Sequence, residues 1–264
     1  MMFTIEQIHA AFARIGMKAP DLPFVPTAEL LSDIQYHFAA AVPYENLDIL
    51  AGIPLSLEET DLYDKIVNRH RGGYCFEVNG FLTAWLRSMG YDVTEYMARY
   101  LRGETDIPMR RHRVLAVTCA DGTRWIVDAG IGQAAFRRPL PFAEGAEMTV
   151  NGETYHVVKK DFYGWVIEDW HNDAWRPFYG FTEEVQLNLD YVMPSFWCEK
   201  HPDSPFTKAN MLSIKTDTGR CTLDGNTFRR FDGADVTEKT LSDAEIPVVL
   251  AEVFGLTDVY YQKG

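Results

Sequence analysis

The sequence has little cysteine and no excess of positive charge. Its four cysteines, Cys75, Cys119, Cys198 and Cys221, lie far apart and form no CxxC pair. This excludes the disulfide framework of a small secreted protein. The formal net charge is −13, whereas nucleic-acid binding needs a basic surface, so we expect no nucleic-acid partner.

Long apolar runs and targeting features are also missing. No apolar run approaches the length of a membrane span, and Met1–Gln7 lacks the basic and apolar stretches of a signal peptide. We therefore expect no membrane partner and a cytoplasmic protein. Cys198 and His201, even with Cys221 and His171, have an incomplete spacing for zinc, so we expect no metal.

The length and the periodicity of the chain predict an α+β protein. A chain of 264 residues, 47% of them hydrophobic, can bury a sizeable core in two or three small domains. Helical periodicity comes first, and short alternating runs with turn signals follow. The predicted parts are a helical bundle over 1–90, an antiparallel sheet or small barrel over 91–189, a connecting helix over 190–204, and strands with a helix over 205–264.

Four helices are predicted in the first part, the first three of them with capping residues at their starts. These starts are, in order, Thr4 with Gln7, Thr27, Ser56 with Glu59, and Cys75. The fourth helix is predicted to end at Gly90. The stretch Pro43–Asp48, between the second and the third, is predicted to be a loop.

Turn and capping signals also organise the rest of the chain. The dipeptides at 121–122 (Asp-Gly) and 151–152 (Asn-Gly) predict two hairpins in the central sheet. Pro194 is expected to interrupt the connecting helix. Ser242 with Glu245 predicts a capping box that opens a last helix, which ends at Gly255.

The stretch 71–80, RGGYCFEVNG, contains a candidate nucleophile. Its two glycines permit a tight turn, and the apolar pattern of a helix begins directly after Cys75. The unpaired N–H groups and positive dipole end of a helix N-terminus favour an anion such as a thiolate. An inert, buried cysteine is the alternative interpretation.

His112 and Asp128 are the candidate partners of Cys75. His112 lies in one predicted strand, and Asp128 ends another, just before the glycine-rich AGIG. Singly, each has an ordinary explanation as a surface histidine or a turn-capping acid. Together with Cys75 they supply a nucleophile, a base and an orienting acid, the three roles of a catalytic triad.

The length of one hairpin loop decides whether the histidine and the aspartate can meet. A two-residue loop of Asp121 and Gly122 points the two side chains to opposite faces of the sheet. A three-residue loop that includes Ala120, with Gly122 left-handed, makes them a diagonal pair on one face. The sequence leaves both loops open.

Several stretches resemble the arylamine N-acetyltransferase family and follow the family's order. They are PYENL at 43–47, RGGYCFE at 71–77, His112 on its strand, DAGIG at 128–132 and PDSPF at 202–206. The resemblance implies an N-terminal helical bundle, a central antiparallel β-barrel and a C-terminal α/β lid, with a cysteine-protease-like Cys-His-Asp core.

The resemblance also implies an activity. The implied reaction transfers an acetyl group from acetyl-CoA, a co-substrate, to the nitrogen of an arylamine or arylhydrazine through an acetyl-cysteine intermediate. The enzyme is expected to be a monomer or a homodimer and to need no metal. Two other functions stay open on the residues alone. One is a cysteine hydrolase or transglutaminase-like enzyme, and the other is a catalytically silent homologue that binds CoA.

The resemblance assigns roles to eight residues. They are Cys75, His112 and Asp128 as the catalytic residues, Ile131, Phe38 and Tyr74 as substrate-binding residues, and Arg71 with Glu45 as an ion pair that pins the cysteine loop. At the position of Ile131 the family usually has phenylalanine, so this position is expected to influence which amines are accepted.

Overall fold

Short helices make up the first part of the chain. The computed structural model describes residues 2–259. The helices of this part are α1 (Ile5–Arg14), α2 (Ala28–Ala41), α3 (Leu47–Leu50), α4 (Glu59–Tyr63), the π-helical turn η1 (Asp64–Asn68) and α5 (Cys75–Ser88). No helix within residues 2–259 is long and apolar enough to cross a membrane.

Two of the predicted helix caps form, and one does not. Thr4 and Gln7 make the predicted capping box at α1, and the Thr27 hydroxyl accepts the N–H of Leu30 at α2. The predicted capping box of Ser56 with Glu59 is wrong. The Ser56 hydroxyl instead donates to Asp61 at 2.6 Å, so α4 begins only at Glu59. The predicted loop at 43–48 also ends early, because α3 begins at Leu47.

The central strands form one antiparallel sheet that curls into a near-barrel. The strands are β1 (Asp92–Tyr100), β2 (Arg110–Thr118), β3 (Arg124–Val127), β4 (Leu140–Pro141), β5 (Glu147–Val150), β6 (Glu153–Lys160), β7 (Gly164–His171) and β8 (Ala174–Val185). Their spatial order is β4-β3-β2-β1-β8-β7-β6-β5, and β4 also contacts β5 and β6, so the two ends of the sheet approach each other. Closing a sheet in this way leaves few exposed strand edges.

The loop between β2 and β3 has three residues. The N–H of Cys119 donates to the carbonyl of Thr123 at 2.9 Å, so these two residues face each other. Gly122 has a φ of +83°, the left-handed conformation that this loop requires. Since the pairing is in this register, His112 and Asp128 lie on the same face of the sheet. The other hairpin, at 151–152, has a two-residue loop.

The C-terminal part is a second, smaller sheet with flanking helices. Its elements are the turn η3 (Asn188–Tyr191), α6 (Val192–Lys200), the turn η4 (Pro205–Thr207), β9 (Met211–Lys215), β10 (Gly219–Asp224), β11 (Thr227–Asp232), β12 (Asp235–Thr240) and α7 (Ile246–Glu252). The strands predicted in this part lie near 211–216, 227–231 and 236–239, so β10 was not predicted, because only Cys221 and Leu223 in it are apolar.

Two predictions for this part need correction. Pro194 does not interrupt α6, because it lies in the first turn of the helix, where its missing N–H would have no partner anyway. Ser242 does not cap α7. Its N–H and hydroxyl both donate to the Glu245 carboxylate, so the helix begins after Glu245.

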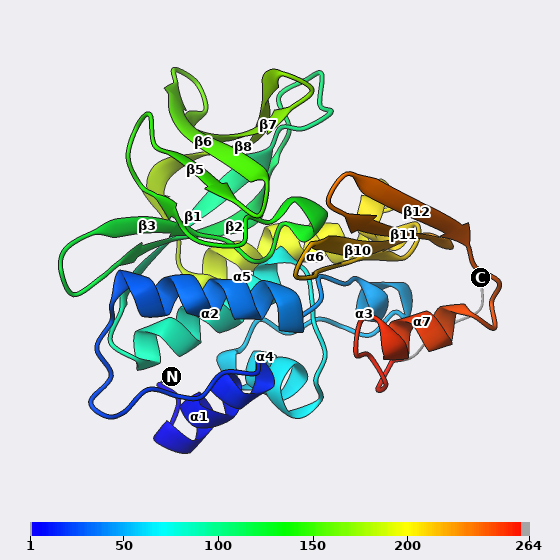
Figure 1. Cartoon of the computed structure of the whole chain (residues 1–264), viewed down its shortest axis with the longest axis horizontal. Coiled ribbons are helices and arrows are strands. Elements are labelled where there is room, and N and C mark those ends of the chain that lie inside the picture. Colours follow the sequence, from blue (N-terminus) through cyan, green and yellow to red (C-terminus); the bar gives the residue numbers. More distant parts are fainter. Residues whose placement is uncertain (1, 260–264) are drawn as a thin grey trace.

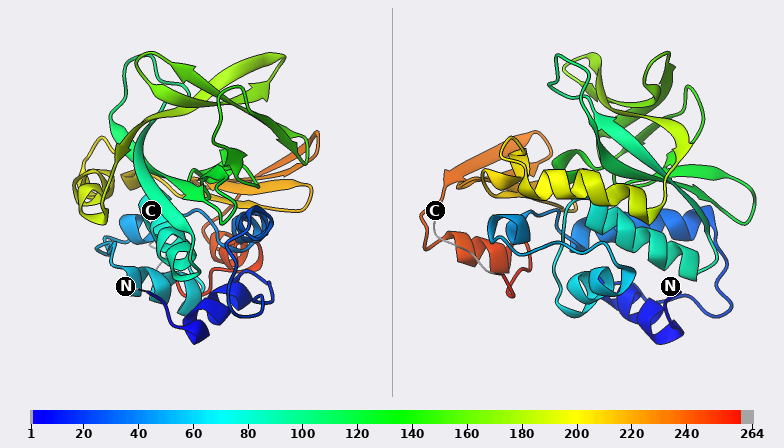
Figure 2. Two further views of the ribbon diagram at one scale, coloured as in Figure 1. Left: turned by 90° about the vertical axis from the view of Figure 1, so that its left-hand side faces the viewer. Right: turned by 180° about the vertical axis from the view of Figure 1, so that it is seen from behind.

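The three parts meet around α5. In Figure 1 the curled sheet stands above the helices, and the C-terminal sheet lies beside both. Helix α5 contacts β1 and β2, and Figure 2 shows α6 running between the curled sheet and the helices. One buried cluster joins residues of α1, α2 and α5 to residues of β2 and β3. This core contains residues from both sides of the predicted boundary at residue 90. The domain boundaries at 90, 189 and 204 stay a prediction.

Five charged side chains are buried together beneath the cysteine loop. Arg71 contacts the carboxylates of Glu45 at 2.7 Å and Asp48 at 2.8 Å. Lys65 contacts Asp48 and Glu77, both at 2.7 Å. Removing one partner of a buried ion pair leaves an uncompensated charge, which is strongly destabilising. This network ties α3 to the loop that precedes Cys75.

Arg71→Leu is expected to lower the free energy of unfolding by about 3–5 kcal/mol, because Glu45 and Asp48 lose a buried partner. Arg69→Leu is the matched control, since Arg69 pairs with Asp258 on the surface. That change should alter stability by no more than about 1 kcal/mol. Denaturant unfolding of both variants checks this, and equal losses would contradict a special role for the buried network.

Candidate active site

Cys75 is the first residue of α5 and is almost fully buried. The turn before it depends on glycine, since a Cβ on Gly72 would lie 1.8 Å from the carbonyl oxygen of Pro43. The N–H of Tyr74 donates to Glu77 at 3.2 Å and fixes the start of the helix. Within residues 2–259 the N–H of Cys75 has no hydrogen-bond acceptor, so it is free to bind an oxyanion.

His112 and Asp128 meet Cys75 from the curled sheet. Asp128 directly follows β3, and its Oδ2 lies 2.6 Å from Nε2 of His112 on β2. The Cys75 thiol donates to the carbonyl of Arg111 at 3.8 Å, and the neighbouring His112 side chain acts to lower the pKa of the thiol. Since Nε2 faces Asp128, Nδ1 is the ring nitrogen left for the thiol. The structure therefore brings the three predicted residues together in the order thiol, imidazole, carboxylate.

Burial and charge act against each other at this site. Burial lowers the pKa of His112, but the Asp128 carboxylate and the Cys75 side chain together outweigh it and raise the pKa to about 10. Burial raises the pKa of the Cys75 thiol, while the hydrogen bond and charge of His112 lower it. Asp128 thus makes His112 a strong base beside a buried thiol, the relation that a triad needs.

Three residues that the sequence analysis did not single out hold the aspartate in place. Asn79, one turn after Cys75 on α5, donates to Asp128 Oδ1 at 2.9 Å and to the carbonyl of Arg113 at 2.6 Å. The side chain of Gln35 accepts the N–H of Asp128 at 3.3 Å. Gly130 packs so closely that a Cβ there would lie 2.8 Å from Cα of Cys75.

No sequence motif marks Asn79 or Gln35 as part of a site. A polar residue that interrupts the apolar face of a predicted helix is the one available signal, since buried amides need partners. Both side chains are at most 1% exposed. They are positioning residues that join two helices to the aspartate.

Cys75 and His112 open onto a cavity of about 640 Å³. Its walls come from all three parts of the chain, and the C-terminal sheet closes one side. The lining residues outside the triad include Tyr44, Tyr100, Arg111, Ile131, Phe206, Arg229 and Phe231. A space of this size admits a small aromatic molecule together with part of a larger ligand.

The structure places one of the three predicted substrate-binding residues in this cavity. Ile131 lines it, as expected. Phe38 does not, because it faces the helical core from α2 and stacks on Phe81 with 6.1 Å between ring centroids. Tyr74 does not line it either, because its hydroxyl lies 2.6 Å from Ser195 Oγ and its ring packs on Phe206.

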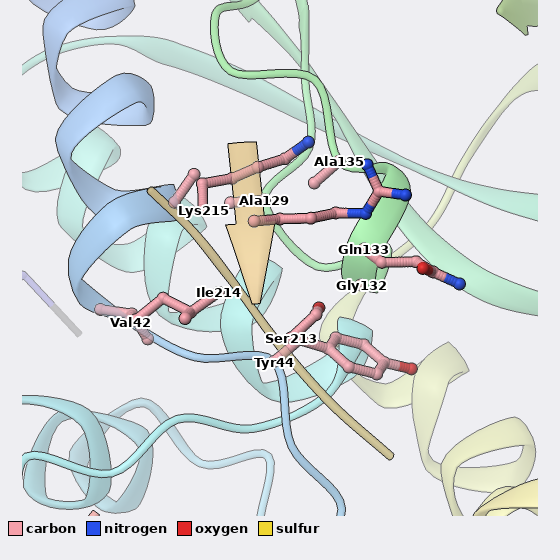
Figure 3. A pocket seen from close by; sticks show the side chains of 11 residues that line it. Val42, Tyr44, Ala129, Gly132, Gln133, Ala135, Ser213, Ile214 and Lys215 are labelled. Carbon is pink, nitrogen blue, oxygen red and sulfur yellow. The ribbon is translucent and has the colours of Figure 1, made fainter. Parts of the chain in front are cut away.

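Tyr44 is one of the aromatic lining residues that the prediction missed. It belongs to PYENL, and its N–H and carbonyl pair with Ser213 of β9 at 2.9 and 3.0 Å. Behind it lies a second cavity of about 10 Å³, the size of one water molecule. Figure 3 shows Tyr44, Gln133, Ser213 and Lys215 around this small pocket.

The predicted ion pair of Arg71 with Glu45 is present, and both side chains are fully buried. Within residues 2–259, no three His, Cys, Asp or Glu side chains are grouped so as to hold a metal ion.

A helical part, a curled antiparallel sheet and a smaller C-terminal sheet meet at a Cys-His-Asp arrangement, which defines an α+β fold with a cysteine-protease-like core. The family model described as N-acetyltransferase matches residues 27–259. The arylamine N-acetyltransferase / N-hydroxyarylamine O-acetyltransferase of Salmonella typhimurium is 33% identical over 256 residues, which cover 94% of this chain and 88% of that protein. The arylamine N-acetyltransferase of Mycobacterium tuberculosis (strain H37Rv) is 32% identical, with 88% and 83% covered.

Solved structures agree with these matches. The arylamine N-acetyltransferase from Salmonella typhimurium superposes with a TM-score of 0.90 at 29% identity, covering 100% of this chain and 95% of that one. The Mycobacterium marinum enzyme in complex with CoA gives a TM-score of 0.87 at 28% identity, covering 95% and 93%. The chain belongs to the arylamine N-acetyltransferase family, and it is an acyltransferase.

Asp128→Asn is expected to reduce acetyl transfer by roughly a thousandfold or more, because the charge that supports a protonated His112 is lost. The folded pKa of His112 lies above 6.5, so the charged contact stabilises the fold fully below pH 6.5. This stabilisation is lost as the pH rises to about 10. The difference in unfolding free energy between wild type and variant should therefore shrink over that range.

The measurements are steady-state rates and denaturant unfolding at several pH values. If the variant keeps most of its activity, the account is contradicted, and Asp128 only caps the turn after β3.

Proposed function

We propose that this enzyme transfers an acetyl group from acetyl-CoA to the nitrogen of an arylamine or arylhydrazine. The observation that carries the proposal is that Cys75 and His112 share one wall of the large cavity, with Asp128 behind them. The family membership supports the acyl chemistry, and the CoA complex of a relative supports the donor.

The first half-reaction acetylates the enzyme. In the resting enzyme Nδ1 of His112 already holds the proton that Cys75 has lost, and the Cys75 thiolate attacks the thioester carbonyl carbon of acetyl-CoA. The unpaired N–H of Cys75 stabilises the oxyanion. When the tetrahedral intermediate collapses, the bond from carbon to the CoA sulfur breaks. The CoA thiolate takes the proton from His112 and leaves as the free thiol.

The second half-reaction releases the product. The amine nitrogen attacks the acetyl-cysteine carbonyl, and His112 accepts the proton that the nitrogen loses. The carbon–sulfur bond to Cys75 breaks and leaves a thiolate beside the imidazolium. Because the acetyl group remains a thioester throughout, it keeps the reactivity of the donor, and the two steps give ping-pong kinetics.

Intact-protein mass spectrometry tests the intermediate. Incubation with acetyl-CoA alone is expected to add one acetyl group, and adding an arylamine should remove it. Cys75→Ala should take up no label, because Cys75 is the nucleophile. Cys221→Ala is a suitable control, since that buried cysteine belongs to the core of the C-terminal sheet.

Three other results would contradict the proposal. A label on Cys119, Cys198 or Cys221 would overturn the assignment of the nucleophile. Acylation by amides or peptides but not by acetyl-CoA would favour a cysteine hydrolase or transglutaminase-like enzyme. No acyl-enzyme with any donor would favour a silent homologue that binds CoA.

Ile131→Phe tests the acceptor side of the cavity. The added ring can stack on an aromatic amine, a contact worth about 0.5–1.5 kcal/mol, so deacetylation by arylamines should change by roughly two- to twelvefold. Acetylation of Cys75 by acetyl-CoA should barely change. Single-turnover rates of the two half-reactions, with two or three amines of different size, separate these effects.

Ile131 does not contact the acceptor if both half-reactions change equally, or if the ranking of the amines stays the same. Phe38→Leu is the matched control, because Phe38 lies in the helical core and should alter stability without altering the ranking.

A further inference from the structure

The outward face of α6 is apolar, although the helix lies at the surface. In the view from behind, Figure 2 shows α6 at the front of the molecule. Leu189 of η3 and Val192, Met193 and Phe196 of α6 have the spacing i, i+3, i+4 and i+7, so they share one side of the helix. We call these four residues the α6 stripe. Their exposed fractions run from 48% to 79%. A stripe with this spacing ordinarily faces a core, so its exposure needs an explanation.

The opposite face of α6 already anchors the helix. Tyr191, Ser195 and Cys198 are at most 5% exposed. The Ser195 hydroxyl lies 2.6 Å from that of Tyr74. Cys198 belongs to the buried cluster that contains Tyr74 and Cys75. The fold of a single chain therefore does not need the α6 stripe to be apolar.

Two further exposed apolar residues directly precede the α6 stripe in the chain. Val185 ends β8 and is 62% exposed, and Leu187 in the connection that follows is 68% exposed. A monomer rarely exposes a contiguous apolar patch of more than a few hundred Å². Six large apolar side chains in one short segment make a patch of that order. A standard dimer buries about 800 Å² of each partner around an apolar core, so this patch has the size of such a core.

The charges around the stripe favour a second copy of this chain over a membrane. A helix that lies on a membrane surface carries lysine and arginine on its polar face, whereas Lys200 is the one basic residue of α6. The net charge of −13 would also be repelled by an anionic lipid surface. The stripe instead has complementary ends, because the exposed Asp190 lies at its start and the exposed Lys200 at its end. Two copies that pair antiparallel bring each aspartate toward the other copy's lysine.

We propose that the α6 stripe is the interface of a homodimer, in which two copies of α6 pack antiparallel across a two-fold axis. Met193 of each copy then packs against the partner's Phe196, and Asp190 lies near the partner's Lys200. A surface that pairs with itself in this way gives a closed dimer, the commonest symmetry of soluble oligomers. None of the four stripe residues lines the large cavity, so the proposal does not depend on the reaction or its substrates.

The mass in solution tests the proposal. Analytical ultracentrifugation of the wild type at micromolar concentration should give twice the chain mass of 30.1 kDa. Met193→Glu and Phe196→Lys each place two uncompensated charges, one from each copy, in the apolar centre of the interface. Each variant should weaken the dimer by about a hundredfold or more and sediment as a monomer. Because both side chains are exposed in a single chain, both variants should keep the far-UV circular dichroism of the wild type.

Mixing the two variants distinguishes a lost interface from a damaged fold. In a heterodimer of Met193→Glu with Phe196→Lys, the new carboxylate faces the new ammonium group, and the second contact is still that of Met193 with Phe196. An equimolar mixture should therefore sediment as a dimer, although neither variant does so alone. Val248→Glu is the matched control, because Val248 is a 50% exposed apolar residue of α7 outside the stripe. This variant should remain a dimer.

A monomeric wild type would overturn the proposal. A dimer that persists in both Met193→Glu and Phe196→Lys would also overturn it, since another surface would then hold the two copies. A mixture of the variants that stays monomeric would show that the antiparallel pairing is wrong. Vesicles of phosphatidylcholine with phosphatidylglycerol test the other occupant. If a monomeric wild type sediments with them and Met193→Glu does not, the stripe is a membrane contact and not a dimer interface.

Discussion

The contact between His112 and Asp128 is the interaction on which the site depends. Its 2.6 Å geometry exists because a three-residue loop sets the register of β2 and β3. Asn79 and Gln35 then fix the carboxylate from two helices, so the contact also joins the helical part to the curled sheet. Shortening that loop by one residue would shift the register and turn the histidine and the aspartate to opposite faces of the sheet.

The candidate catalytic residues could be predicted from the sequence, whereas the residues that position them could not. Cys75 could be named as a candidate because two glycines precede a helix start, and His112 and Asp128 supported it. Asn79 looks like any polar residue of a helix until the strand opposite is known. Phe38 lies in the helical core and not at the cavity, and the sequence could not show this, since an apolar residue on a helix faces the core or a cavity according to what packs on it.

The fold was predicted well in segments where the apolar residues follow one clear periodicity. It was predicted poorly where polar side chains compete for the hydrogen bonds of the backbone. The paired strands of the central sheet lie close to where alternation put them, whereas β10, with two apolar residues, was missed. Ser56 and Ser242 had the spacing of caps, but neighbouring carboxylates accept their hydroxyls instead. Spacing predicts which side chains can meet, and the packed structure decides which contact forms.

The most direct test of this account is the protonation state of His112 in the resting enzyme. Nitrogen-15 NMR of the imidazole rings distinguishes a doubly protonated ring from a neutral one, and the six other histidines serve as references. If Asp128 and Cys75 together outweigh burial, His112 is doubly protonated at neutral pH and titrates near a pH of about 10. A neutral ring at neutral pH would show that burial prevails, and would contradict the account.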